Sequence, residues 1–198
     1  MDTINLYGAS GHALVVMEAA ESAGLSVGCL YDDAPHCADL HGHPVVKGAE
    51  GAAVAGPLLI SIGSNRARRM VAGRCDVPYA TVVASTATIS PTARVGEGSV
   101  VMHGAIVQAD ARIGRHCIVN TGASVDHECV IGDFVHIAPH ATLCGNVQVG
   151  EGTLIGAGTT VIPSIRIGAG CTIGAGSVVV RDIPDGATAC GNPCRVVK

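Results

Sequence analysis

From Ile89 to Val179 an aliphatic residue returns at every sixth position of the chain without a miss. The series reads Ile89, Val95, Val101, Val107, Ile113, Val119, Val125, Ile131, Ile137, Leu143, Val149, Ile155, Val161, Ile167, Ile173 and Val179. A period of six fits neither an amphipathic helix nor an alternating strand, whereas it fits a solenoid of six-residue repeats. We therefore expect a parallel β-helix in which each repeat turns one aliphatic side chain inward.

The number of repeats sets the size of this β-helix. Three repeats make one triangular coil, and neighbouring coils pair as parallel strands at a spacing of about 4.8 Å, so the prism is roughly 25 Å tall. We expect the β-helix over residues 85–185 and an extended tail over residues 186–198. A small residue mostly stands two positions before each aliphatic one, and Cys117, Cys129 and Cys171 occupy this slot as apolar fillers.

The N-terminal segment has a different pattern. Residues 3–7 read as a strand, a glycine turn follows, and residues 13–23 read as a helix that leads to a strand over residues 26–31. Such a βαβ opening places free N–H groups at the helix start, where they can hold an anion, and an acid pair about 20 residues on commonly contacts a ribose. We expect residues 1–84 to form an α/β, Rossmann-like nucleotide-binding domain. Its candidate ligands are Gly8, Ser10, Gly11, His12, Asp32 and Asp33.

A second junction between a strand and a helix lies further along this domain. Strands are predicted over residues 44–47 and 57–62, and short helices over residues 49–55 and 66–73. The turn that precedes the last helix faces the same edge of the sheet as the first turn, which makes Asn65 and Arg66 candidate nucleotide ligands. Arg68 and Arg69 are expected on a solvated helix face. A domain of this size has room for half of a dinucleotide fold, which favours a mononucleotide or a nucleotide sugar over NAD.

Composition argues against several classes of partner. The 198 residues carry a net charge of −4 and only two lysines, so no basic stripe is present for a nucleic-acid backbone. No apolar run approaches the roughly 18 residues of a membrane span, and the first strand follows the N-terminus directly, without a signal segment. We expect a cytoplasmic protein with neither a nucleic-acid nor a membrane partner.

The chemistry must come from residues that break the small, apolar or Gly pattern of the repeat. These are Asn120, Asp126, His127, Glu128, His136 and His140. Because one coil comprises eighteen residues, Gly145 should lie above His127. A histidine with a carboxylate beside it and a glycine N–H nearby can supply a general base and an oxyanion donor. This chemistry requires no metal.

Two segments of the chain resemble one protein family. Residues 120–136 and the tail at residues 191–198 are similar to those of the bacterial nucleotide-sugar acetyltransferases of the bacillosamine-pathway and sialic acid O-acetyltransferase type. The resemblance covers essentially the whole chain. It implies a left-handed β-helix, acetyl-CoA as cosubstrate, and a homotrimer with active sites between subunits.

The resemblance also implies roles for single residues. His127 would be the catalytic base and Glu128 its acidic partner, while Asn120 would contact the amino sugar. Gly11, His12, Asp32 and Asp33 would bind the UDP part. The residues expected around acetyl-CoA are His136 and the Gly145 N–H at the thioester, and Ala157, Ile162, Pro163 and Ala175 along the pantetheine and adenine.

The expected reaction is acetylation of the 4-amine of a UDP-4-amino-4,6-dideoxy sugar related to N-acetylglucosamine. O-acetylation of sialic acid or its CMP form is the alternative, and a GDP-linked amino sugar such as perosamine is another. Zinc carbonic anhydrases are also trimeric β-helices, but the resemblance to them fails on the spacing of the histidines. A nucleotide-binding scaffold without activity stays open, because a fold does not imply a function.

Overall fold

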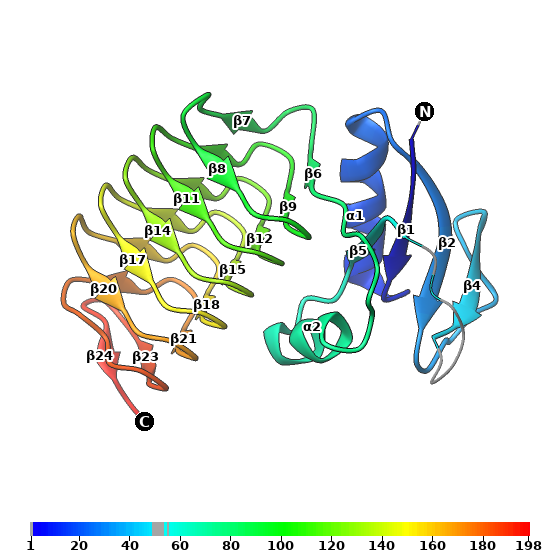
Figure 1. Ribbon diagram of the computed structural model, residues 1–198. Coiled ribbons are helices and arrows are strands. Elements are labelled where there is room, and N and C mark those ends of the chain that lie inside the picture. Colours follow the sequence, from blue (N-terminus) through cyan, green and yellow to red (C-terminus); the bar gives the residue numbers. More distant parts are fainter. Residues whose placement is uncertain (1, 49–53, 55) are drawn as a thin grey trace.

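The computed structural model describes residues 2–48, 54 and 56–198. An N-terminal α/β domain stands beside a long β-helix, and the C-terminus lies at the far end of the prism (Figure 1). The predicted helix over residues 49–55 lies outside the described residues, apart from Val54.

The N-terminal domain is a small parallel sheet flanked by helices. Its sheet has the order β3-β4-β2-β1-β5. β1 pairs in parallel with β2 and β5, β2 pairs in parallel with β4, and only the short β3 is antiparallel to its neighbour β4. The predicted Rossmann-like arrangement is therefore confirmed. In chain order the elements are β1 (Thr3–Tyr7), α1 (Gly11–Ser22), β2 (Ser26–Asp32), β3 (Asp39–Leu40), β4 (His43–Lys47), β5 (Leu58–Ile60) and α2 (Asn65–Ala72).

The β-helix has three parallel sheets, which we call the first, second and third sheets in the order that each coil visits them. The first sheet contains β6 (Val82–Val83), β9 (Val100–Val101), β12 (Ile118–Val119), β15 (His136–Ile137), β18 (Leu154–Ile155), β21 (Thr172–Ile173), β23 (Thr188–Cys190) and β24 (Arg195–Val196). The second contains β7 (Thr88–Ile89), β10 (Ile106–Val107), β13 (Ser124–Val125), β16 (Thr142–Leu143), β19 (Thr160–Val161) and β22 (Val178–Val179). The third contains β8 (Arg94–Val95), β11 (Arg112–Ile113), β14 (Val130–Ile131), β17 (Gln148–Val149) and β20 (Arg166–Ile167).

Strand register follows the eighteen-residue coil throughout the repeat. Ile118 pairs with His136, and Ser124 pairs with Thr142. From Val101 onward, the aliphatic residue of every repeat turns inward and is buried. Cys117, Cys129 and Cys171 are buried with these residues, as predicted. Outward side chains therefore stack in straight rows along each face. The turns at each corner of the triangular prism also stack in rows. We name the corners by the sheets that they join: corner 1–2, corner 2–3 and corner 3–1.

Strand pairing extends beyond both ends of the periodic stretch. β6 lies one repeat before Ile89 and pairs with β9. At the other end Ile183 bridges to Ile167, β23 pairs with β21, and the antiparallel β24 closes the prism. The chain thus passes from the N-terminal domain into the first coil without a linker.

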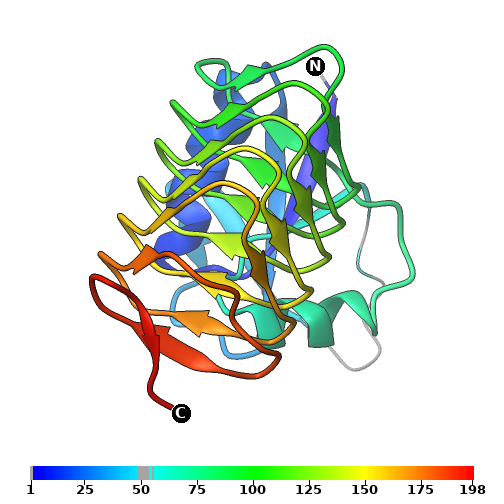
Figure 2. The same ribbon diagram turned by 90° about the vertical axis from the view of Figure 1, so that its left-hand side faces the viewer.

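The N-terminal domain packs against the upper part of the first sheet. Outward side chains of this sheet, Val82, Val100 and Ile118, are buried in one apolar cluster with Ala13 and Val16 of α1. Figures 1 and 2 show the coils stacked alongside this domain, with α2 close to the lower coils. Corner 2–3 is the edge of the triangular prism that lies opposite the first sheet.

Candidate active site

His127 and Glu128 lie at corner 2–3, between β13 and β14. The His127 Nδ1 is 3.0 Å from Oε2 of Glu128. Because a carboxylate can only accept, Nδ1 carries a proton, and in the neutral form of the ring Nε2 is the nitrogen with the free lone pair. The side chains of His127 and Glu128 are 56% and 65% exposed. The ring is thus oriented as a proton acceptor that a substrate can reach.

The backbone of this corner is ordinary for the fold. Glu128 has a φ of +59°, but Asp110, Asn146 and Ser164 occupy the same place in other coils and have φ values of +59°, +60° and +62°. The left-handed conformation is therefore a property of the turn and not strain at the site. The His127 N–H donates to Asp126 Oδ1 at 2.7 Å, which stiffens the turn before the ring.

Gly145 lies against the ring of His127, at the same corner of the next coil along the chain, as the register predicts. A Cβ added to Gly145 would stand 2.4 Å from the His127 Nε2 and 2.5 Å from its Cε1. The ring, and not an unusual backbone angle, is what requires glycine here. Among the described residues the Gly145 N–H has no backbone or side-chain acceptor. A free donor therefore lies next to the basic nitrogen.

Asn120 and His136 lie apart from this corner, on the first sheet where it meets the N-terminal domain. The His136 Nε2 is 3.0 Å from Asn120 Nδ2, and its Nδ1 is 3.2 Å from the carbonyl oxygen of Gly63. Burial, and then the nearby charge of Arg68, lowers the pKa of His136 to about 4. The ring is neutral at pH 7, and both of its nitrogens already have partners.

The glycine turn before α1 takes the predicted place at the end of β1. Gly8 has a φ of +113°, and a Cβ there would stand 2.9 Å from the Ser61 carbonyl oxygen, so only glycine fits. Ser10 is the N-cap residue of α1 and makes no side-chain capping bond, which leaves the first N–H groups, at Gly11 and His12, open. The buried His12 Nε2 has no hydrogen-bond partner among the described residues.

The acid pair after β2 is engaged within the domain. Asp32 accepts from the N–H groups of Ala9 at 2.8 Å and Ala34 at 2.9 Å. Asp33 accepts from the Tyr7 hydroxyl at 2.5 Å and forms an ion pair with Arg74. Burial raises the pKa of Asp33, but the hydrogen bonds from Arg74 and Tyr7 outweigh it and hold the pKa below its usual range. Asp32 shapes the glycine turn, and Asp33 ties β2 to the segment after α2.

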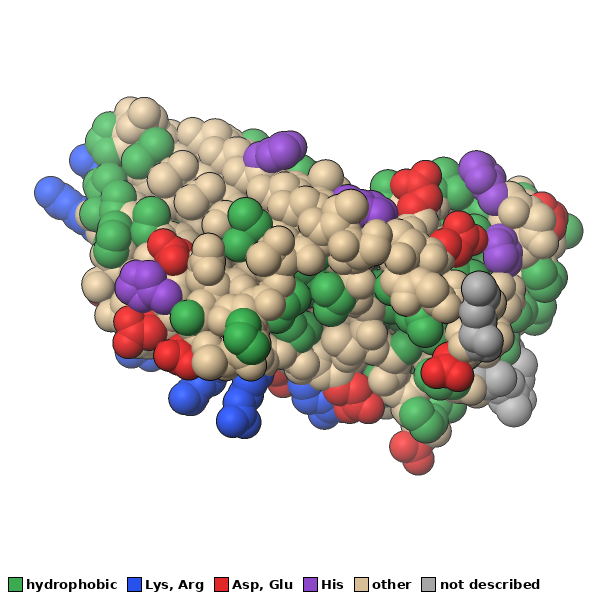
Figure 3. Space-filling view, turned by 90° about the horizontal axis from the view of Figure 1, so that it is seen from above, with side chains coloured by type: hydrophobic (Ala, Val, Ile, Leu, Met, Phe, Trp, Pro, Cys, Tyr) green, Lys and Arg blue, Asp and Glu red, His purple; other side chains and the backbone are tan. Residues whose placement is uncertain are grey.

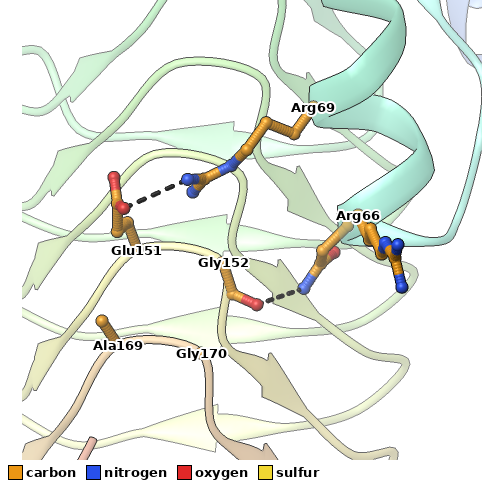
Figure 4. Close-up of a pocket in the computed structure, with 7 residues that line it drawn as sticks. Arg66, Arg69, Glu151, Gly152, Ala169 and Gly170 are labelled. Carbon is orange, nitrogen blue, oxygen red and sulfur yellow. Dashed lines mark hydrogen bonds and ion pairs between the residues drawn. The ribbon is translucent and has the colours of Figure 1, made fainter. Parts of the chain in front are cut away.

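The start of α2 forms one wall of a pocket against corner 3–1. Asn65 Nδ2 donates to the Gly152 carbonyl at 3.0 Å, and Arg69 forms an ion pair with Glu151 at 3.1 Å. Arg66 is exposed and extends away from that pair (Figure 4). The pocket has a volume of about 390 Å³. A neighbouring pocket of about 430 Å³ shares Asn65 and Gly152 with it and reaches His136.

The residues expected around coenzyme A fall on two corners. Ala157 and Ala175 lie at corner 1–2, where the Gly176 N–H donates to the Ala157 carbonyl. Ile162 and Pro163 lie at corner 2–3, one coil above Cys144 and Gly145, and Ile162 is 37% exposed. These corners bound opposite edges of the second sheet, so one chain does not bring the four residues together.

Sequence reasoning missed two arginines of the N-terminal domain. Arg68 was expected on a solvated face together with Arg69, and this prediction is wrong because Arg68 is 0% exposed. Helical spacing does indicate that Arg68 is buried, because Arg68 and Val71 share one face of α2, whereas the exposed Arg69 and Met70 lie on the opposite face. Arg74 pairs with an acid 41 positions away, and no local pattern signals such a contact.

Two kinds of feature are absent from the described part of the chain. Residues 2–48, 54 and 56–198 contain no group of three or more His, Cys, Asp or Glu side chains that could hold a metal ion. Within the same residues, no helix combines the length and apolar character needed to cross a membrane.

Two family models match the chain. Residues 3–75 match the PglD N-terminal domain. Residues 128–163 and 146–181 match the bacterial transferase hexapeptide (six repeats). A search of curated proteins found no match.

Solved structures resemble the whole chain. The acetyltransferase domain of PglB from Neisseria gonorrhoeae FA1090, in complex with acetyl coenzyme A, is 36% identical over 98% of each chain, with a TM-score of 0.91. A His-to-Asn mutant of perosamine N-acetyltransferase from Caulobacter crescentus, in complex with CoA and GDP-perosamine, is 36% identical over 100% of this chain and 97% of that one, with a TM-score of 0.92. WeeI from Acinetobacter baumannii AYE is 27% identical over 98% of this chain and 100% of its own, with a TM-score of 0.85.

Fold and similarity together define the class of protein, an acetyltransferase built on a hexapeptide β-helix. Within that class the chain belongs to the nucleotide-sugar acetyltransferase family, as the resemblance in sequence indicates.

Proposed function

We propose that this enzyme transfers the acetyl group of acetyl-CoA to the 4-amino group of a UDP-linked 4-amino-4,6-dideoxy sugar, with His127 as general base. The observation that carries the proposal is the corner where the His127 Nε2 lies against Gly145 while its Nδ1 is held by Glu128. Relatives that are 36% identical bind acetyl coenzyme A, or CoA together with GDP-perosamine, which supports the class of both substrates.

The reaction requires a base because an amine at neutral pH is mostly ammonium and has no lone pair to offer. The sugar reacts as the fraction that has already lost one proton to solvent and is a free amine. His127 Nε2 removes a second proton from the nitrogen as it attacks the thioester carbonyl, and the Glu128 carboxylate stabilises the imidazolium. The Gly145 N–H donates to the oxyanion of the tetrahedral intermediate. When the intermediate collapses, the C–N bond is kept, the C–S bond breaks, and coenzyme A leaves as a thiolate that takes the proton from His127.

In this proposal the active site has two parts, the corner with His127 and the region around Asn120, and they come together between subunits. His127 lies at corner 2–3, opposite the sheet that carries the N-terminal domain and Asn120. If three prisms turn their second sheets toward a common axis, corner 2–3 of each one meets corner 1–2 of the next. His127 and Pro163 of one subunit then face Asn120, Ala157 and Ala175 of its neighbour.

The outward face of the second sheet suits this arrangement. It carries only uncharged side chains of small or moderate size, whereas the outward face of the third sheet carries arginines, which gather along one side of the β-helix (Figure 3). A face without charges can be buried in a trimer at little desolvation cost. The outward residues of the second sheet are Thr88, Ile106, Ser124, Thr142, Thr160 and Val178.

The nucleotide binds in this proposal at the edge where β1, β2 and β5 end. The open N–H groups of Gly11 and His12 face the diphosphate, and the unpartnered His12 Nε2 is a further donor or acceptor. Arg66, which is exposed at the start of α2, provides a positive charge for a phosphate. Asp32, with each carboxylate oxygen still able to accept, contacts the ribose.

The test is a coenzyme A release assay with acetyl-CoA and matched acceptors. UDP-, GDP- and CMP-linked sugars are compared, each with an amino group or a hydroxyl at the acceptor position. We expect release with amino sugars alone and the highest kcat/KM with the UDP sugar, and mass spectrometry should show an amide. Release only with hydroxyl acceptors would make the enzyme an O-acetyltransferase and would overturn the proposal.

A further inference from the structure

Arg68 of α2 is a fully buried cation, and no acidic side chain among the described residues pairs with it. Its Nε donates to the His116 carbonyl at 2.7 Å, and its Nη2 donates to the Phe134 carbonyl at 3.0 Å and to Asn65 Oδ1 at 2.8 Å. Its Nη1 donates to the carbonyls of Ile62 at 3.0 Å and Gly63 at 3.3 Å. All five N–H groups of the guanidinium are therefore used. Every acceptor is a carbonyl or amide oxygen, and none is a carboxylate.

Burying this guanidinium between the two domains costs free energy of folding. Burial of an unpaired charge is unfavourable, and an apolar residue of similar volume often serves stability equally well. Burial lowers the pKa of Arg68 to about 10, which still leaves it charged at neutral pH. The five acceptors come from the turn before α2, from α2 itself and from corner 3–1 of two successive coils. Arg68 therefore fixes that turn relative to the β-helix.

One of these acceptors, the Gly63 carbonyl, connects Arg68 to the first sheet. The same oxygen is 3.2 Å from the His136 Nδ1, and an oxygen of this kind can only accept. The proton of the neutral His136 ring must then be on Nδ1, and Nε2 accepts from the Asn120 amide at 3.0 Å. The Asn120 Oδ1 in turn accepts from the Thr121 N–H at 2.8 Å. The Asn120 side chain is held at both ends.

We propose that Arg68 is a positioning residue for acetyl transfer, because it fixes the Gly63 carbonyl so that His136 keeps its proton on Nδ1 and holds the Asn120 amide toward the acceptor sugar. The role of Asn120 rests on the proposed function, whereas the state of the His136 ring does not. In the part of the chain that the structure describes, two side chains with a charge or a titratable group face this ring: Arg68 from α2 and His12 from α1.

The geometry predicts how the ring responds when the cation is removed. Without Arg68, the His136 pKa rises, so a larger fraction of the ring is protonated as the pH falls. A protonated ring has hydrogens on both nitrogens and cannot accept from Asn120. The acceptor sugar is then bound less well at low pH, because Asn120 is no longer held toward it.

The test combines side-chain ¹⁵N NMR of the histidines with steady-state kinetics on wild type, Arg68→Met and Arg68→Lys. Arg69→Met is the matched control, because Arg69 is the next residue of α2 and its contacts are an exposed ion pair with Glu151 and a cation–π contact with the Phe134 ring, neither of which involves Gly63 or His136. In wild type we expect a neutral His136 with its proton on Nδ1 at pH 6. In Arg68→Met we expect the His136 ring to become protonated at a higher pH than in wild type, and a KM for the acceptor raised by about tenfold, the scale of one lost hydrogen bond.

Further outcomes separate positioning from folding. Arg68→Lys keeps the charge without the five-bond geometry, so its His136 should stay neutral while the acceptor KM still rises. The control should change neither quantity. A wild-type His136 with its proton on Nε2 would overturn the proposal even if Arg68→Met does not fold. An unchanged acceptor KM in folded Arg68→Met would also overturn it, whereas a wild type inactive on every acceptor would refute the proposed function alone.

Discussion

Replacement of His127 by alanine is expected to lower kcat by a factor of about 10² to 10⁴, the usual contribution of a general base. The imidazole ring, which lies against Gly145, is the proposed base. Without this ring, the amine must lose its proton to water. KM for acetyl-CoA should change little, because the expected coenzyme A track lies along other residues. Coenzyme A release under saturating acceptor measures the effect.

The control for this variant is a measurement of its thermal stability and oligomeric state. The His127 side chain is 56% exposed in the single chain, so its truncation should leave the thermal stability and the proposed trimer unchanged relative to wild type. Wild-type kcat together with unchanged stability and oligomeric state would remove His127 from the mechanism. Glu128 would then have no base to orient, and the acetyl transfer would need another proton acceptor.

Replacement of Gly145 by alanine is expected to lower kcat by about 10²-fold or more, although it adds a single methyl group. The new Cβ would stand 2.4 Å from the His127 Nε2, which is far closer than real contacts allow. The ring must rotate away, and it then leaves both the Glu128 carboxylate and the place where the amine attacks. The measurement is again coenzyme A release, with a crystal structure to locate the ring.

A second glycine provides a matched control. Gly73 ends α2 with ordinary helical angles, and a Cβ there would meet only helix carbonyl oxygens at 3.5 Å or more. Gly73→Ala should therefore keep wild-type activity. If Gly145→Ala were equally active, the ring would not need its place against this glycine, and the oxyanion role of the Gly145 N–H would lose its support.

The β-helix and its catalytic corner could be predicted because the repeat fixes the register. Once a coil is known to contain eighteen residues, Gly145 must lie above His127, and the structure confirms this. The same arithmetic places Asn120 on the first sheet. It also separates Ala157 and Ala175 from Ile162 and Pro163, although the resemblance groups all four around one coenzyme.

The contacts between the domains could not be predicted in this way. They depend on how α2 docks against corner 3–1, and no period relates the two elements. Arg68 was expected on a solvated helix face beside Arg69, yet docking buries it among carbonyl oxygens from three segments. Asp33 fitted a ribose contact in sequence, but folding brings Arg74 and Tyr7 to it. Long-range pairing therefore decides what these residues are free to do.

The most direct test of the account is activity in mixed trimers, because its central claim is that His127 of one subunit acts on a sugar held by its neighbour. His127→Ala and Asn120→Ala, each of which we expect to be impaired alone at an acceptor concentration below KM, are unfolded together and refolded as an equal mixture. A site between subunits is intact when one half comes from each variant in the productive order, so about a quarter of wild-type activity should return. No recovery in well-formed mixed trimers would place both residues in the same subunit's site and contradict the account.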